Sequence, residues 1–201
     1  MGVARNFKMY VLGLLFAISA TTAIANDDHG SIVDKLSAVD GAQALIAALL
    51  VVDESTVLDV SIAEALDTID GIILLAPTNP AFEALLGLEP GFLDGLSVDE
   101  IKAALPSILA DLGLTISDVI NILLLHVGVI GDVNESTAGV EALLAAGGVP
   151  VAGSAEPLPV SLGSKGVRIN YEASVIKADD FADNGVIHFL DTVLVGDLLA
   201  Q

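Results

Sequence analysis

The stretch from Ile72 to Phe82 places the strongest constraint on how this chain can fold. Its first five residues, Ile72 to Ala76, are all apolar and have the length of a short β-strand buried on both faces. Asn79 carries the side chain of a helix N-cap, and Pro80 suits the first helical position, where no amide hydrogen is needed. The sequence therefore predicts a strand that enters a helix through one tight turn, with Phe82 packed back against the strand.

The first 25 residues have the features of a secretory signal peptide. Arg5 and Lys8 precede an apolar run from Met9 to Ala20, and Ala23-Ile24-Ala25 offers the small-x-small pattern of a signal peptidase site. The run is shorter than the ~20 residues that a membrane span requires. We therefore expect cleavage near Ala25 and a mature protein that is exported to the periplasm, the cell surface or the extracellular space.

The composition of the mature chain favours one domain with an aliphatic core. Hydrophobic residues make up 54% of the sequence and aromatic residues 4%, and there is no cysteine for a disulfide. With Arg5 and Lys8 removed, 27 acidic residues face five basic ones, a net charge of −22. Nucleic acid and anionic membranes are poor partners for such a surface. A solvated, salt-tolerant surface is the favoured interpretation. A calcium-binding surface is the alternative, although no EF-hand loop is present.

The order of the expected elements predicts an α+β fold. After a polar, disordered start at 26–30, Ser/Thr residues followed three positions later by Asp or Glu mark helix starts at Ser31, Ser61, Ser97 and Thr115. Further helices are expected over 42–50, after Asn79 and over 141–146, and Pro106 should end or bend the helix that begins at Ser97. Strands are expected at 127–130, 149–152, 158–162, 167–170 and 174–177. An acidic loop at 179–183 and the turn Asn184-Gly185 then lead into two last strands.

Three stretches in this order resemble the signatures of the fasciclin domain. They are Ala76-Pro77-Thr78-Asn79-Pro80-Ala81-Phe82, the segment from Asn121 to Gly131, and the segment from Asn184 to Val195. The resemblance implies a wedge of two β-sheets flanked by α-helices, with the helices mainly in the N-terminal half. It also implies one domain over residues 31–201. The segment 53–70 departs from the family pattern, which has only a brief link there, and the cap at Ser61 predicts a short extra helix on an insertion.

The sequence offers little for catalysis. It has no cysteine nucleophile, no Gly-x-Ser-x-Gly elbow, no His-Glu-x-x-His pair and no phosphate-binding loop. His126 and His188 are the histidines expected in the folded part. A metal site from these two and an aspartate is conceivable, but buried histidines hydrogen-bonded to turns are favoured. We therefore predict a protein that is not an enzyme and has no cofactor.

The function that the resemblance implies is adhesion or interaction with a protein or a cell-surface or matrix component, with weak self-association left open. The candidate interaction residues are Thr78, Asn79, Phe82, His126, Asn184 and His188. We expect His126 to tie the second signature to the Thr78-Asn79 turn by a hydrogen bond; the alternative is that this region touches a partner. The alternative function is binding of an apolar small molecule such as a carotenoid, which the few aromatic side chains disfavour.

Overall fold

The computed structural model describes residues 30–196 apart from 56, 59 and 132, so the expected signal peptide and disordered start lie outside the described residues, apart from Gly30. The helices are α2 (Ile32–Ala38), α3 (Gln43–Glu54), α4 (Ile62–Thr68), α5 (Asn79–Leu86), the 3-10 helix η1 (Leu93–Gly95), α6 (Val98–Asp111), α7 (Ile116–Leu125), α8 (Glu135–Ala138) and α9 (Val140–Ala146). The strands are β1 (Ile72–Pro77), β2 (Val127–Val129), β3 (Gly148–Val149), β4 (Leu158–Gly163), β5 (Gly166–Ile169), β6 (Ala173–Ala182) and β7 (Gly185–Leu190).

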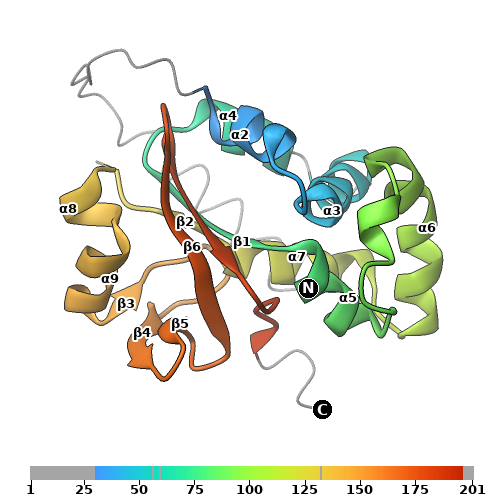
Figure 1. Cartoon of the computed structure of the whole chain (residues 1–201). Coiled ribbons are helices and arrows are strands. Elements are labelled where there is room, and N and C mark those ends of the chain that lie inside the picture. The colour runs from blue at the N-terminus through green and yellow to red at the C-terminus, as the bar shows by residue number, and fades with distance from the viewer. Residues whose placement is uncertain (1–29, 56, 59, 132, 197–201) are drawn as a thin grey trace.

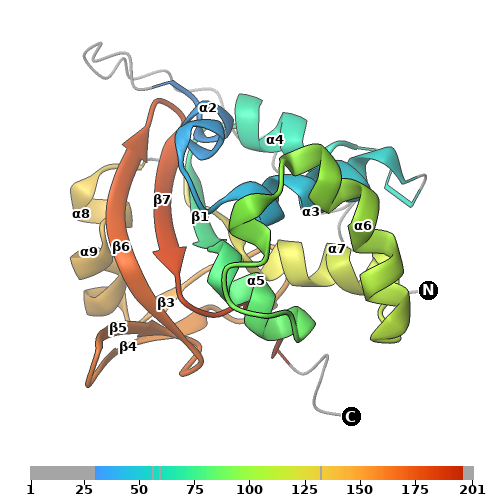
Figure 2. The same cartoon turned by 45° about the vertical axis from the view of Figure 1, so that its right-hand side comes forward.

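The predicted α+β class and its helix-rich N-terminal half are confirmed. Seven strands pair in the order β2-β1-β7-β6-β5-β4-β3. β1 and β7 run parallel, and the other neighbours are antiparallel. The long strand β6 pairs with β7 on one side and with β5 on the other. It therefore joins the strands β2, β1 and β7 to the strands β5, β4 and β3 (Figure 2). Two register shifts between Val175 and Asp180 interrupt its pairing with β7, as β-bulges do where a strand bends.

β1 is the central element, as its apolar run predicts, and all six of its residues are buried. Ile72, Leu74 and Ala76 join one hydrophobic cluster, which α2 to α7 cover, while Ile73 and Leu75 join a second cluster. The second cluster is covered by α8, α9 and β3 to β5 on the opposite side (Figure 1). We call these the helical side and the strand side of β1.

The predicted helix starts are confirmed by their hydrogen bonds. Ser31, Ser97 and Thr115 each form a full capping box with the acidic residue three positions on, and Ser61 accepts from the amide of Glu64. These caps are local features, so the sequence alone locates them. Gly87, at φ 66°, ends α5 in the left-handed conformation that glycine adopts without strain.

Pro106 does not end α6, which continues to Asp111. Two other expectations about element ends are wrong. The acidic stretch 179–183 is not a loop, because β6 extends to Ala182, and Asp180 there accepts hydrogen bonds from Lys35 and Lys177 that offset its charge. After β7 the chain forms no further strand up to residue 196. Helix α8, capped by Asn134, was not expected.

No single helix among the described residues has the length and apolar character to cross a membrane. The pair α6 and α7 reaches that length and composition together, with a bend of 108° between them.

Candidate functional site

An apolar pocket lies between α4, one edge of the sheet and the segment 150–157. Its volume is about 310 Å³. α4 supplies Ile62, Ala65, Leu66 and, just after its end, Ile69. Because positions three and four apart in a helix lie on one face, these residues form a single apolar stripe turned toward the sheet.

The opposite wall comes from the sheet and from the end of α7. Ile72 of β1, Val127 and Val129 of β2, and Leu124 of α7 line it. β2 is the edge strand and pairs only with β1, so the wall ends at the edge of the sheet. The segment 150–157 covers this edge.

Two short backbone hydrogen bonds hold the segment 150–157 in place. The amide of Ala152 donates to the carbonyl of Val127 at 2.8 Å, and that of Gly153 donates to the carbonyl of Leu124 at 2.8 Å. Glycine is required at this contact, because a Cβ on Gly153 would lie 2.7 Å from the amide nitrogen of Leu125. The pocket rim is thus fixed by the backbone.

Asp53, at the end of α3, fixes the N-terminus of α4. Its carboxylate accepts from the amides of Ile62 and Ala63 at 2.7 and 3.1 Å and from the hydroxyl of Ser61 at 2.6 Å. Negative charge at a helix N-terminus is favourable, because the first amides have no partner within the helix. The segment 53–70 contains the predicted short helix, and that helix forms one wall of the pocket.

Asn184, a candidate interaction residue, fixes the other end of α4. Its side-chain amide donates to the carbonyls of Leu66 and Ile69 at 2.8 and 3.2 Å. Its side-chain oxygen accepts from the amide of Ile32 at 2.9 Å, at the start of α2. One buried residue in the β6–β7 turn therefore connects two helices and positions the pocket wall.

Asn79 does not cap its own helix as predicted. Thr78 is the N-cap of α5 and makes no side-chain cap bond; both its amide and its hydroxyl donate to the carbonyl of Leu190 at 3.2 Å. Asn79 is fully buried, and its side-chain oxygen accepts from the amide of Ala44, in the first turn of α3, at 3.1 Å. The N-cap of α3 is Ala42, which has no side-chain acceptor, so Asn79 supplies one from another element.

Phe82 is buried in the helical-side cluster, as predicted. On the same helix, the carboxylate of Glu83 is also buried and accepts from the amides of Gly91 and Leu93, each at 2.8 Å. Sequence reasoning missed Glu83, because an acidic residue on a helix is normally solvated.

His126 is buried as expected, but its partner is not the Thr78-Asn79 turn. Its Nδ1–H donates to the carbonyl of Ile122 at 2.7 Å, and its Nε2 accepts from the amide of Leu194 at 3.0 Å. Only its backbone reaches β1, where its carbonyl accepts from the amide of Leu75. The side chain therefore joins the second signature to the third. Burial is the main cause that lowers the pKa of His126 to about 4.

His188 lies in β7 on the strand side. Its Nε2–H donates to the carbonyl of Ala138 at 3.0 Å, and its Nδ1 accepts from the amide of Asp179 at 3.2 Å. Burial lowers its pKa, against the opposing effects of the Ala138 hydrogen bond and the Asp179 charge. The two histidines thus make separate sets of contacts. Among the described residues no group of three or more His, Asp or Glu side chains is arranged to hold a metal ion.

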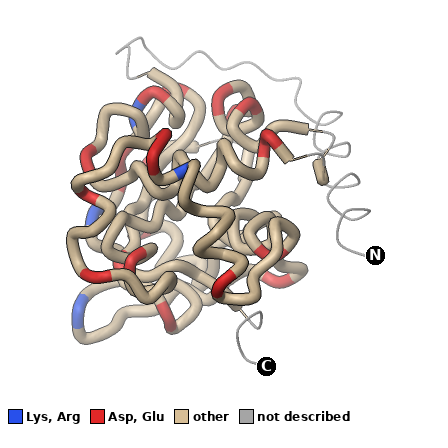
Figure 3. The backbone as a smooth tube through the Cα atoms, turned by 90° about the vertical axis from the view of Figure 1, so that its right-hand side faces the viewer, with Lys and Arg blue, Asp and Glu red and all other residues tan. Residues whose placement is uncertain are grey.

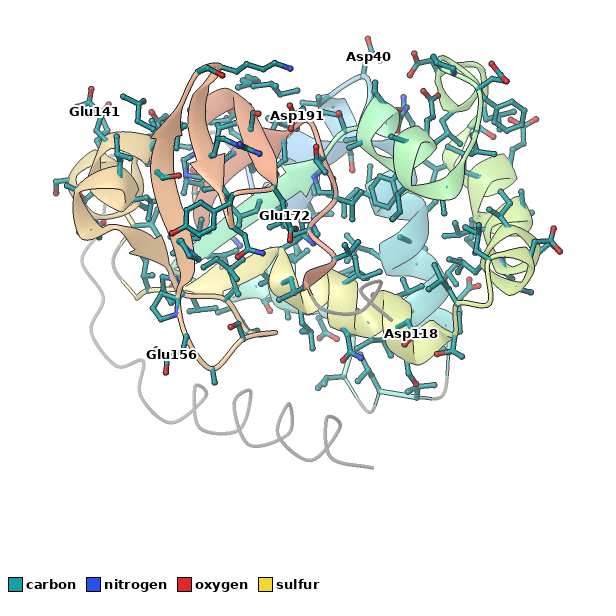
Figure 4. All side chains as sticks on the ribbon, turned by 90° about the horizontal axis from the view of Figure 1, so that it is seen from below. Asp40, Asp118, Glu141, Glu156, Glu172 and Asp191 are labelled. Carbon is teal, nitrogen blue, oxygen red and sulfur yellow. The ribbon has the colours of Figure 1, made fainter. Side chains whose placement is uncertain are left out.

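Acidic residues occur in many parts of the described chain, and basic residues are few (Figure 3). Glu156 is exposed at the pocket rim and points away from the body of the molecule (Figure 4). The one local sign of the pocket is the spacing of three and four residues between the apolar side chains of α4. The rest could not be predicted, because the other walls come from segments that are distant from α4 in the sequence.

Comparison with known proteins gives a consistent result. The Fasciclin domain family model matches residues 54–196. Among solved structures, a FAS1 domain pair from the insect cell adhesion molecule Fasciclin I is similar in fold, with a TM-score of 0.58 and 13% sequence identity. That match covers 90% of this chain, which spans 60% of the length of the domain pair. A comparison with the curated proteins finds no match.

Proposed function

This chain belongs to the fasciclin domain family, and from that premise we propose that it is a non-catalytic, exported module for adhesion or interaction. It would act at the cell surface, in the extracellular matrix or in the periplasm. Support comes from the family, which is an adhesion-type module, and from a structural relative that is itself part of an insect cell adhesion molecule.

The observation that carries the proposal is that polar side chains of the three signatures are buried and hydrogen-bonded within the protein. Asn79, His126, Asn184 and His188 are all buried, and each side chain makes at least one hydrogen bond to a backbone group of another segment. Such groups hold a scaffold together and are inaccessible to a substrate. The function would therefore lie in the surface that the scaffold presents to a partner.

Capture of a partner tests this function directly. Mature protein (residues 26–201), immobilised through its C-terminus, should retain a specific protein or matrix component from the envelope and culture medium of its source. An equally acidic, unrelated domain controls for charge. N-terminal sequencing of the exported protein should give a start near Asn26. Retention in the cytoplasm, or capture equal to that of the control domain, would contradict the proposal.

A second candidate function is binding of an apolar small molecule, and the pocket beside α4 favours it. Concave sites with apolar walls and few polar groups are typical of small-molecule sites, and about 310 Å³ is at the lower end of their usual size. An absorption spectrum of the natively purified protein is the first test. A visible band would favour a bound pigment such as a carotenoid, and a colourless protein would favour the interaction module or an uncoloured ligand.

A further inference from the structure

The size of the pocket restricts what it can enclose. A cavity of ~150 Å³ holds one benzene molecule, so a pocket of about 310 Å³ has room for about a dozen non-hydrogen atoms. A carotenoid is several times larger and would leave most of its length outside. A compact ring system or a medium-length alkyl chain fits the volume.

The chemistry of the walls restricts the ligand further. The inner walls from α4 and the sheet carry only aliphatic side chains, and the described polar residues that line the pocket, Ser154 and Glu156, come from segment 150–157 at its rim. The hydroxyl of Ser154 donates to the carbonyl of Glu156 at 2.7 Å, which leaves its oxygen able to accept a hydrogen bond. A ligand would therefore place an apolar body inside and a polar end at the rim.

The charge at the rim selects against anions. Glu156 is the one charged residue among the described residues that line the pocket, and the mature chain has an expected net charge of −22. A unit charge about 4 Å from a carboxylate in water changes affinity about fivefold at low ionic strength, and screening reduces the effect. A carboxylate at the ligand's polar end would be repelled, and a hydroxyl or an ammonium group would not.

We propose that the pocket formed by α4, the β2 edge and segment 150–157 binds uncharged or cationic apolar molecules of about a dozen non-hydrogen atoms and discriminates against fatty-acid anions. This inference rests on the second candidate function above and names its ligand class. It is independent of any protein partner that the surface binds.

A series of n-alkanols from hexanol to tetradecanol tests the size. Each methylene that enters the pocket should raise affinity up to about fourfold, and the gain should end near decanol to dodecanol, where the pocket is full. Binding is followed by amide chemical shifts of the isotope-labelled mature protein, and the shifted amides should be those of α4, β2 and 150–157. Affinity that keeps rising to tetradecanol would overturn the size limit while leaving apolar binding intact.

Decanol, decanoate and decylammonium, compared at pH 7.5 and low salt, test the charge. Decanoate should bind more weakly than decanol, by up to about fivefold where the two carboxylates come within about 4 Å, and the difference should shrink in high salt or in Glu156→Gln. In Glu156→Gln the affinity of decanoate should rise relative to that of decanol, because the carboxylate that repels the anion is removed. Equal binding of decanoate and decanol by the wild-type protein would overturn the charge selection.

A filled pocket provides the matched control. Ala65→Phe places a ring in the pocket and should abolish decanol binding, whereas Ala63→Phe, on the same helix but outside the pocket lining, should not. If Ala65→Phe fails to fold, the alkanol series and Glu156→Gln still decide the matter. If no alkanol shifts the amides around the pocket and solvent extraction of the native protein yields no apolar molecule, both this inference and the second candidate function fall.

Discussion

The two sides of β1 both bury polar side chains, but they use different chemistry. On the helical side Asn79, Glu83 and Asn184 accept from or donate to the backbone at helix ends and loops. On the strand side the corresponding contacts come from His126, which binds Leu194, and His188, which binds Ala138. An amide keeps its donors and acceptors at every pH, whereas an imidazole loses its acceptor when it is protonated.

This difference predicts how the hydrogen bonds on each side of β1 respond to pH. On the helical side the amides of Asn79 and Asn184 keep their hydrogen bonds at every pH, whereas the buried carboxylate of Glu83 gives up acceptor capacity when it is protonated in acid. The strand side depends on neutral imidazoles, and burial favours the neutral form by lowering both pKa values. The hydrogen bonds by which Asn184 positions the pocket wall do not depend on pH, because an amide does not titrate.

Asn184→Ala should have the largest effect. It removes three hydrogen bonds and leaves the amide of Ile32 and the carbonyls of Leu66 and Ile69 without these partners. Each buried unsatisfied group costs about 1–3 kcal/mol, so the free energy of unfolding should fall by about 3 kcal/mol or more. Denaturant unfolding followed by circular dichroism measures it. Asn134→Ala, which removes an exposed cap from α8, is the control and should cost about 1 kcal/mol. Equal losses would show that Asn184 is no more than a local turn residue.

His126→Ala should have the next largest effect. It leaves a cavity and removes the side-chain partner of the Leu194 amide, and each of these costs on the order of 1–3 kcal/mol. Any loss of adhesion would then follow from loss of folded protein. Denaturant melts beside an adhesion assay check this, and a variant with wild-type stability and no binding would show that the region touches a partner.

The parts of the fold that depend on neighbouring residues could be predicted from the sequence. The β1–α5 joint and the capping boxes at Ser31, Ser97 and Thr115 are set within a few positions. Features that depend on distant partners could not. Asn79 serves α3 because Ala42 cannot cap that helix, and the acidic part of β6 is stabilised by Lys35, which is 145 residues away.

The site was less predictable than the fold for the same reason. The residues that the resemblance marks, such as Asn184, turn out to position the pocket wall and do not line the pocket. Its lining comes from α4, the segment 150–157, the strands β1 and β2 and the end of α7, whose apolar residues have no distinctive spacing relative to one another. Only their contact in the folded chain reveals the pocket.

Acidification should weaken the protein by a moderate amount through the strand side. The pKa of His126 is about 4 in the folded protein, against an ordinary value of 6.5. As the pH falls from about 7 toward 4, His126 is therefore protonated in the unfolded state but still neutral in the folded state, and the free energy of unfolding decreases. Between pH 7 and pH 5 the loss from this residue should be about 2 kcal/mol. Unfolding free energies at both pH values measure it. Asn184→Ala should keep the wild-type pH dependence, and His126→Gln should reduce it. A pH dependence unchanged by His126→Gln would contradict this assignment.

Salt should have the smallest effect and should act on both sides alike. Lys35 and Lys177 both pair with Asp180, and Lys102 pairs with Glu54, so the few cations neutralise only part of the acidic surface. The remaining repulsion opposes the compact state, and screening should raise the melting temperature by a few degrees. Thermal melts in NaCl and in CaCl₂ at equal ionic strength separate two explanations. Equal shifts indicate screening, whereas a distinctly larger shift in CaCl₂ indicates bound calcium. A melting temperature that does not rise with either salt would mean that the acidic side chains are already far enough apart not to repel.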